Sequence, residues 1–289
     1  MGPSAIAPET VRYHDTTSAY TLPNDATEHE RLEFQSRGFD AMMLGKPFHA
    51  PLPNPGRIID IGCGTGVMTT RLGCEFPSAQ VYGVDLSPVP ALQEKPANVD
   101  FIQGDVMKLV GVLPELQMGS VDYAFNRLLV CGMTDWPGYV SSIFSLLKPG
   151  GWLEMHEHDL IFYDKSGKVI SSSWRWLNAT IDSVKRKGLD PFAGSHIADY
   201  MRSAGFVDIQ VKEYKCPHGP MPDAPETKLI EAYDMTEVPR MYKRSMPRIL
   251  EGSGYGTENL DAFYAEIDET MGPEEGKHRK FRVAWGRKP

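Results

Sequence analysis

Short apolar runs and longer amphipathic stretches alternate along most of this chain. Apolar runs that end in acidic or turn-forming residues predict strands at 57–61, 80–85, 99–103, 121–126 and 152–157. Amphipathic segments between them predict helices at 66–76, about 105–117 and 136–147. Strands and helices that alternate through short crossovers are typical of a parallel sheet covered on both faces. The pattern therefore predicts an α/β fold.

The segment before the first predicted strand has a different pattern. Apolar residues from Leu32 to Met43 predict an amphipathic helix that follows Glu28, and Pro51, Pro53 and Pro55 then form a linker. We therefore expect residues 1–50 to be an N-terminal helical cap or lid. Residues 51–289 are expected to form the main domain.

The second half of the chain predicts further elements with long segments between them. A helix is expected at 171–187, and Ser195 is expected to cap another helix that ends at Gly205. Strands are expected at 206–211 and, last in the chain, at 281–286. The insertions at about 160–200 and 214–272 are expected to build a substrate pocket. Candidate pocket residues in them are Trp174, Trp176, Phe192, Met221, Tyr233, Met241 and Tyr242.

A glycine-rich turn follows the first predicted strand. The strand carries Asp60, and Gly62, Gly64 and Gly66 come next at alternate positions. Residues without Cβ adopt positive φ and let a cofactor approach the backbone. A dinucleotide-binding turn has its third glycine one residue later, where this chain has Val67. The spacing therefore favours S-adenosylmethionine (SAM) over a nicotinamide cofactor.

Two further acids follow the next two strands. Asp85 ends the second strand about 20 residues after the turn, where a carboxylate can accept both ribose hydroxyls. Asp105 follows the third strand, within reach of an adenine amino group. We expect these acids, with their neighbours Leu86 and Val106, to bind the cofactor. One Gly-Asp pair alone would be an ordinary turn, but three acids at three successive strand ends favour a nucleoside site.

Composition limits the class of protein. The 289 residues are 41% hydrophobic and 24% charged, which suits a globular chain with a large core. The formal net charge of −8 argues against a nucleic-acid groove, and the basic clusters 185–187 and 277–280 are expected to be solvated. The four cysteines are widely spaced, so we expect no disulfide framework and no metal site. Without an apolar membrane-spanning run or a signal peptide, a cytoplasmic monomer or homodimer is expected.

Several motifs together resemble one family. They are Tyr20–Asp25 with the following Glu28, Glu30 and Arg31, then Asp85–Pro88, the run Leu147–Trp152 with Glu154 and Glu157, and the closing Gly286–Pro289. In these the chain is similar to the fungal LaeA-like class I methyltransferases. The resemblance implies a Rossmann-like, seven-stranded, mostly parallel sheet with an antiparallel last strand, and SAM as cofactor. It also implies work in fungal secondary metabolism, as a tailoring enzyme or as a regulator.

Other candidate residues are expected near the reacting groups. Tyr20 and Arg31 are expected to reach the methionine carboxylate of SAM or to close a lid over it. Asn126 is expected to face the cleft from the end of the fourth strand, or else to cap the next helix. His156 and His158 are the catalytic candidates, because a strand places both on one face at its carboxyl end and imidazole removes a proton near neutral pH. They would equally suit two metal ligands or structural hydrogen bonds.

The residues together predict a SAM-dependent methyltransferase that acts on a small-molecule natural product. O-methylation is favoured because histidines stand at the cleft, although the chain departs from the family at Gln35–Ser36 and Phe125–Asn126. One alternative is a SAM-binding regulator of secondary metabolism that works through protein partners. Another is an enzyme that keeps the fold and catalyses a cyclisation or rearrangement without methyl transfer.

Overall fold

Seven strands form one mixed sheet in the computed structural model, which describes residues 26–90 and 95–289. They are β1 (Arg57–Ile61), β2 (Gln80–Asp85), β3 (Val99–Gln103), β4 (Val121–Arg127), β5 (Leu147–His158), β6 (Val207–Pro217) and β7 (His278–Arg287). Their spatial order is β3-β2-β1-β4-β5-β7-β6. Pairings from β3 across to β5 are parallel, whereas β7 is antiparallel to both β5 and β6. The expected fold, including the reversed last strand, is confirmed.

The described α-helices surround this sheet. They are α1 (Ala26–Met42), α2 (Val67–Glu75), α3 (Val106–Leu109), α4 (Trp136–Leu146), α5 (Arg175–Arg186), α6 (Ala193–Ala204), α7 (Lys228–Leu250) and α8 (Leu260–Thr270). Short 3-10 turns occur at Pro114–Leu116, Leu129–Cys131, Ser171–Ser173, Pro225–Thr227 and Thr257–Asn259.

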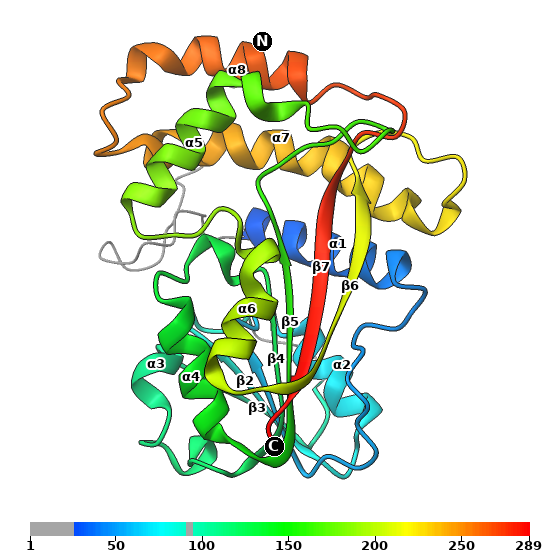
Figure 1. Ribbon diagram of the computed structural model, residues 1–289, viewed down its shortest axis with the longest axis vertical. Helices are drawn as coiled ribbons and strands as arrows, with labels where there is room; N and C mark the ends of the chain where they lie inside the picture. Colours follow the sequence, from blue (N-terminus) through cyan, green and yellow to red (C-terminus); the bar gives the residue numbers. More distant parts are fainter. Residues whose placement is uncertain (1–25, 91–94) are drawn as a thin grey trace, which may run out of the picture.

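The helices divide between the two faces and one edge of the sheet. One apolar core joins the sheet to α3, α4 and α6, and the other joins it to α1, α2, α5, α7 and α8. Figure 1 shows α5, α7 and α8 beyond the edge where the parallel strands end, and α1 lies alongside α7 there. The helices from the N-terminal segment and the long insertions therefore gather over the edge at which ligands bind in open α/β sheets.

Some local predictions were wrong. The helix expected at about 105–117 is reduced to α3 and a 3-10 turn. Ser195 does not cap α6, which begins after Phe192; its N–H and hydroxyl instead donate to the buried carboxylate of Asp159. The last strand starts earlier than expected, at His278. The Ser195 hydroxyl could accept from a helix N–H as a cap or donate to a carboxylate, and its distance from Asp159 in the fold decides between the two roles.

Across the described ranges, 26–90 and 95–289, no helix has both the length and the apolar composition to cross a membrane.

Candidate functional site

The glycine turn at the end of β1 is built on left-handed backbone. Gly62, Gly64 and Gly66 have φ of 66°, 57° and 77°. A Cβ on Gly66 would lie 2.6 Å from the Phe101 ring, so this glycine lets α2 begin close to the sheet. Gly62 and Gly64 line the main cavity, whereas Gly66 does not. Gly66 therefore shapes the turn without lining the cavity.

Two carboxylates hold this turn. Asp85 at the end of β2 accepts from the Gly64 N–H (2.9 Å) and from the Ser87 N–H (2.9 Å). Asp60 at the end of β1 accepts from the Thr69 hydroxyl at 2.6 Å and is only 2% exposed. Burial raises the pKa of Asp60 to about 6. Both acids line the main cavity.

A cavity of about 1170 Å³ runs along the edge where the parallel strands end. The predicted site residues that line it are Arg31, Asp60, Gly62, Gly64, Asp85, Leu86, Asp105, Val106 and His158. Tyr20 lies outside the described residues. Asp105 also begins α3, where its side chain accepts from the Met107 N–H. The acids of three successive strand ends thus line one cavity. We call the part of the cavity beside them the cofactor end, after the role expected for these acids.

Asn126 does not face this cavity, contrary to expectation. Its side chain donates to Glu157 (3.1 Å) and accepts from the Tyr139 hydroxyl (3.0 Å) within the core under α4. Glu157 also accepts from the N–H groups of Leu129 and Val130, while burial raises its pKa to about 8. The helix cap expected as the alternative role is supplied by Asp135 instead. Asn126 and Glu157 therefore support the loop after β4, which lines the cavity.

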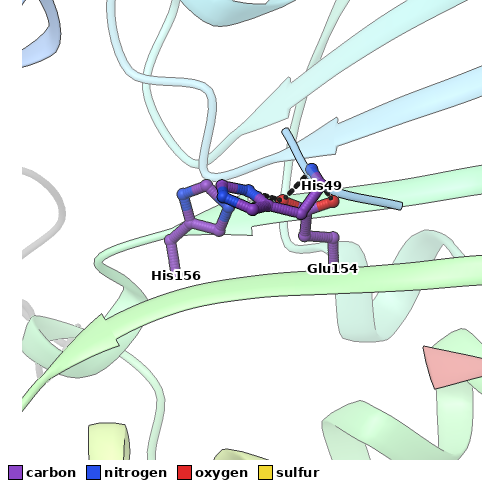
Figure 2. A group of neighbouring side chains, drawn as sticks. All are labelled: His49, Glu154 and His156. Atoms are coloured by element: carbon purple, nitrogen blue, oxygen red, sulfur yellow. Dashed lines mark hydrogen bonds and ion pairs between the residues drawn. The ribbon is translucent and has the colours of Figure 1, made fainter. Parts of the chain in front are cut away.

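His156 is also away from the cavity. Figure 2 shows it with His49 and Glu154, and its Nε2 donates to the Glu154 carboxylate at 2.7 Å. Burial lowers the pKa of His156, which keeps the ring neutral. Its Nδ1 has no hydrogen-bond partner in the part of the chain that the structure describes. An imidazole enclosed in this way cannot reach a substrate, so we no longer assign His156 a catalytic role.

Glu154 is the centre of this cluster. Its oxygens accept from the backbone N–H groups of His49 and Ala50 at 2.8 Å and from the Tyr123 hydroxyl at 3.1 Å. Burial acts to raise its pKa, but hydrogen bonds from His156 and His49 lower it to about 2. The carboxylate is therefore ionised and surrounded by donors.

The His49, Glu154 and His156 side chains also offer ligand atoms that all lie within 4.8 Å of one another, a spacing that could hold a metal ion. Two ligands of one tetrahedral zinc ion would be about 3.3 Å apart, given bonds of about 2.0–2.1 Å. The 2.7 Å between His156 Nε2 and Glu154 Oε1 is a hydrogen-bond distance. These contacts favour a hydrogen-bonded clamp over a metal centre.

His158 does line the cavity, from the last position of β5. Burial lowers its pKa to about 3, and the nearby Arg279 acts in the same direction. Arg279 Nη1 lies 3.5 Å from His158 Nε2, which places the imidazole lone pair toward the guanidinium. A neutral ring with so low a pKa is a weak base. His158 is positioned to touch a ligand, but its environment opposes the role of proton acceptor.

Arg279 was missed by sequence reasoning. Its cluster 277–280 was expected to be solvated, yet Lys277, His278 and Arg279 are buried. Because β7 is antiparallel, its first residues lie at the edge where β5 ends. Arg279 Nη2 donates to both oxygens of Asp234 on α7, at 2.7 and 2.6 Å. The partner is 45 positions away in sequence, so no local pattern could have indicated this pair.

Helices α1, α5 and α7 supply the remaining walls. Arg31 on α1 donates to Glu28 and to the Tyr233 hydroxyl of α7, which joins the cap to the second insertion. Of the pocket candidates, Tyr233, Met241 and Tyr242 line the cavity. Trp174, Trp176, Phe192 and Met221 do not, and both tryptophans are buried in the core.

Known proteins share both the sequence pattern and the fold. Residues 34–211 match the family described as methyltransferase domain. The chain is 30% identical to methyltransferase pytC of Aspergillus terreus over 222 residues, covering 75% of this chain and 67% of that protein. It is 26% identical to the secondary metabolism regulator laeA of Aspergillus fumigatus, covering 93% of this chain and 73% of that protein.

A solved structure confirms the fold. Phosphoethanolamine N-methyltransferase 2 of Haemonchus contortus, in complex with phosphomonomethylethanolamine and S-adenosylhomocysteine, superposes with a TM-score of 0.54 at 20% identity. The match covers 91% of this chain and spans 57% of that protein's chain. By its matching domain, its relatives and its fold, the chain belongs to the LaeA-like class I methyltransferases, which use SAM as cofactor.

Proposed function

We propose that this protein transfers the methyl group of SAM to a small-molecule acceptor, with oxygen as the favoured methyl acceptor, in secondary metabolism. One observation carries the proposal. A single cavity joins the cofactor end to a second region, the acceptor end, beyond His158 and under α5 and α7. Its size suits a cofactor with a small molecule beside it.

The chain's own residues divide the work along this cavity. At the cofactor end, the glycine turn offers close backbone approach, Asp85 offers a carboxylate to the ribose, and Asp105 stands near the expected adenine position. When bound, SAM supplies a methyl group already activated by its sulfonium. The protein then mainly has to hold the acceptor in line with that group and exclude water.

A regulatory function is the second candidate. It is favoured by the match to laeA, which extends over 93% of this chain. A regulator of this kind would bind SAM and act through protein partners. A third possibility from the sequence, cyclisation or rearrangement without methyl transfer, makes no S-adenosylhomocysteine, so one equivalent of this product per turnover would exclude it.

The proposal is tested in two steps with the full chain. Calorimetric titration with SAM, and separately with NAD, is expected to show binding of SAM alone. The protein is then incubated with methyl-labelled SAM and a fungal small-molecule extract, and label is measured in the organic phase and in protein. Label in the organic phase is expected. Label only in protein would contradict the small-molecule acceptor, and SAM binding without any transfer would favour the regulator.

A further inference from the structure

The acceptor end of the cavity has apolar walls. They come from the segment after β5, from α5, from the loop before α6 and from α7. Lining residues of this kind are Leu160, Val184, Leu189, Pro191, Val238 and Met241. A ligand held here is therefore mostly apolar, and the few polar groups among these walls decide which functional group it carries.

Arg279 is a buried cation among these walls. Both Asp234 contacts use Nη2 alone, whereas Nη1 lies 3.5 Å from His158 Nε2. Nε is buried and has no hydrogen-bond partner within residues 26–90 and 95–289. A guanidinium has five N–H donors, and these contacts leave several of them without an oxygen acceptor. The guanidinium also lies over the Phe162 ring, 5.6 Å from its centroid, which fixes its position.

The carboxylates that line the cavity lie mostly away from the acceptor end. Among the described residues that line the cavity, the acids are Glu28, Asp60, Asp85, Asp105 and Asp135. Glu28 pairs with Arg31, and the others lie at the strand ends of the cofactor end or at the start of α4. Asp234, the acid nearest the acceptor end, is already bound by Arg279. An ammonium group there would meet a cation and no free counter-ion.

His158 is the polar side chain beside Arg279, and Thr180, Tyr233, Tyr242 and Ser245 also line the cavity. The neutral ring of His158 beside Arg279 is a weak base, so deprotonation of a hydroxyl by this imidazole is not the way to a nucleophile. A guanidinium stabilises an oxyanion directly and favours the ionised form of an acidic acceptor. The arrangement thus replaces a general base by a cation.

We propose, on the basis of the function proposed above, that the acceptor is an apolar compound bound through an oxygen anion, a carboxylate or an ionised phenol or enol, on Arg279. That anion attacks the methyl carbon and forms the new C–O bond. The C–S bond breaks, and its electron pair returns to sulfur. The proton of a phenol or enol has left for solvent before this step. Arg279 is thereby the specificity-determining residue for an oxygen acceptor.

The test uses three probes with one apolar body: 1-naphthoate, 1-naphthamide and 1-naphthylmethylammonium. Each is titrated calorimetrically into the full chain saturated with S-adenosylhomocysteine. Naphthoate is expected to bind at least about tenfold more tightly than naphthamide, because charge-assisted hydrogen bonds are roughly twice as strong as neutral ones. The ammonium probe is expected not to bind. Equal affinities, a preference for ammonium or binding of none of the three would overturn the proposal.

Variants connect the preference to Arg279. The double substitution Arg279→Met with Asp234→Leu removes both buried charges at similar volume, which proteins often tolerate. It is expected to abolish the naphthoate preference and to retain S-adenosylhomocysteine binding. Arg279→Lys, which keeps a cation but loses the planar fork, is the second variant if the first does not fold, and is expected to reduce the preference. Arg202→Gln, at an exposed arginine of α6, is the matched control.

The two proposals fail in different ways. If S-adenosylhomocysteine does not bind, the proposed function fails, and naphthoate titrated into the free protein still tests the anion site. If it binds but naphthoate is not preferred, the proposal of an anionic acceptor is wrong and the proposed function stands. If naphthoate is preferred but the double variant keeps the preference, the assignment to Arg279 is wrong.

Discussion

Asp85 shows how one side chain can serve both the fold and the site. Its carboxylate accepts from the backbone of the glycine turn through Gly64 and from its own loop through Ser87. It also borders the cavity, where a ribose would add hydroxyl donors. Carboxylate oxygens have about four lone-pair sites in total, so these contacts can coexist.

Asp85→Ala is therefore expected to weaken SAM binding by at least about tenfold, which is about 1.4 kcal/mol. The reason is that each buried donor left without its acceptor costs about 1–3 kcal/mol. Calorimetric titration measures the effect. Asp100→Ala on the neighbouring strand, where the carboxylate is exposed, is the control and should keep its affinity. An unchanged dissociation constant in Asp85→Ala would remove the ribose assignment.

Histidines at the residue scale illustrate the opposite case. His156 and His158 share one strand face, as the alternation of side chains predicts. The two histidines are two positions apart on β5. The His156 ring is nevertheless enclosed by Glu154 and Phe125, whereas His158 borders the cavity. Their spacing in sequence made both equal candidates for catalysis. Only the packing of other segments decides that His158, and not His156, meets the cavity.

At the scale of elements, the turn from β1 into α2 depends on a close approach. Gly66 precedes the first residue of α2, and a Cβ there would lie 2.6 Å and 2.7 Å from two carbons of the Phe101 ring. Phe101 is on β3, so the turn and the third strand constrain each other. The glycine pattern that indicated a cofactor is thus partly a packing requirement.

Gly66→Ala and Gly150→Ala form a matched pair. Both glycines have positive φ, but a Cβ on Gly150 would meet nothing within 4 Å. Gly150→Ala should destabilise the fold by about 1–2 kcal/mol from backbone strain alone. Gly66→Ala should cost a further 1–3 kcal/mol or so from overpacking. Urea unfolding without SAM measures both, and equal losses would show that the Phe101 ring moves aside freely.

At the scale of the whole molecule, Glu154 joins parts of the chain that are far apart in sequence. His49 and Ala50, in the segment between α1 and β1, donate to it across 105 and 104 positions. The His49 Nε2 also lies 2.7 Å from the hydroxyl of Tyr214 on β6. This clamp fixes the segment that follows α1 against the middle of the sheet.

Glu154→Gln is expected to destabilise the protein by about 3 kcal/mol at neutral pH, because an amide offers one acceptor oxygen where the donors require two. Thermal unfolding measures the loss. Glu269→Gln, the same change at an exposed position of α8, should have little effect. A melting temperature equal to that of the wild type would mean that the clamp adds nothing to stability.

The same clamp has a predicted pH dependence. The pKa of Glu154 is lowered from 4.5 to about 2 in the folded protein, so an unfolded chain binds a proton more readily. Stability from this group is therefore fully present above about pH 4.5 and is lost as the pH falls toward 2. The difference in stability between wild type and Glu154→Gln should shrink over that window. A difference that stays constant down to pH 3 would contradict the lowered pKa.

Local physics determined a large part of this protein from the sequence alone. Hydrophobic periodicity located the strands of the parallel core to within a few residues, and β1, β2 and β3 have the predicted bounds. The glycine spacing and the acids Asp60, Asp85 and Asp105 were readable because each depends on its own strand end. Because the strands are parallel, these glycines and acids all lie at the same edge of the sheet.

Tertiary structure alone decided which polar side chains meet the cavity. Asn126 faces Glu157 and Arg279 reaches Asp234, 31 and 45 positions away in sequence. His156 faces Glu154 two positions away on β5, in a cluster that His49 from a distant segment joins. The physical reason is that a polar side chain in a core takes whichever partner satisfies it. That choice depends on how distant segments pack, and no local pattern in the sequence records it.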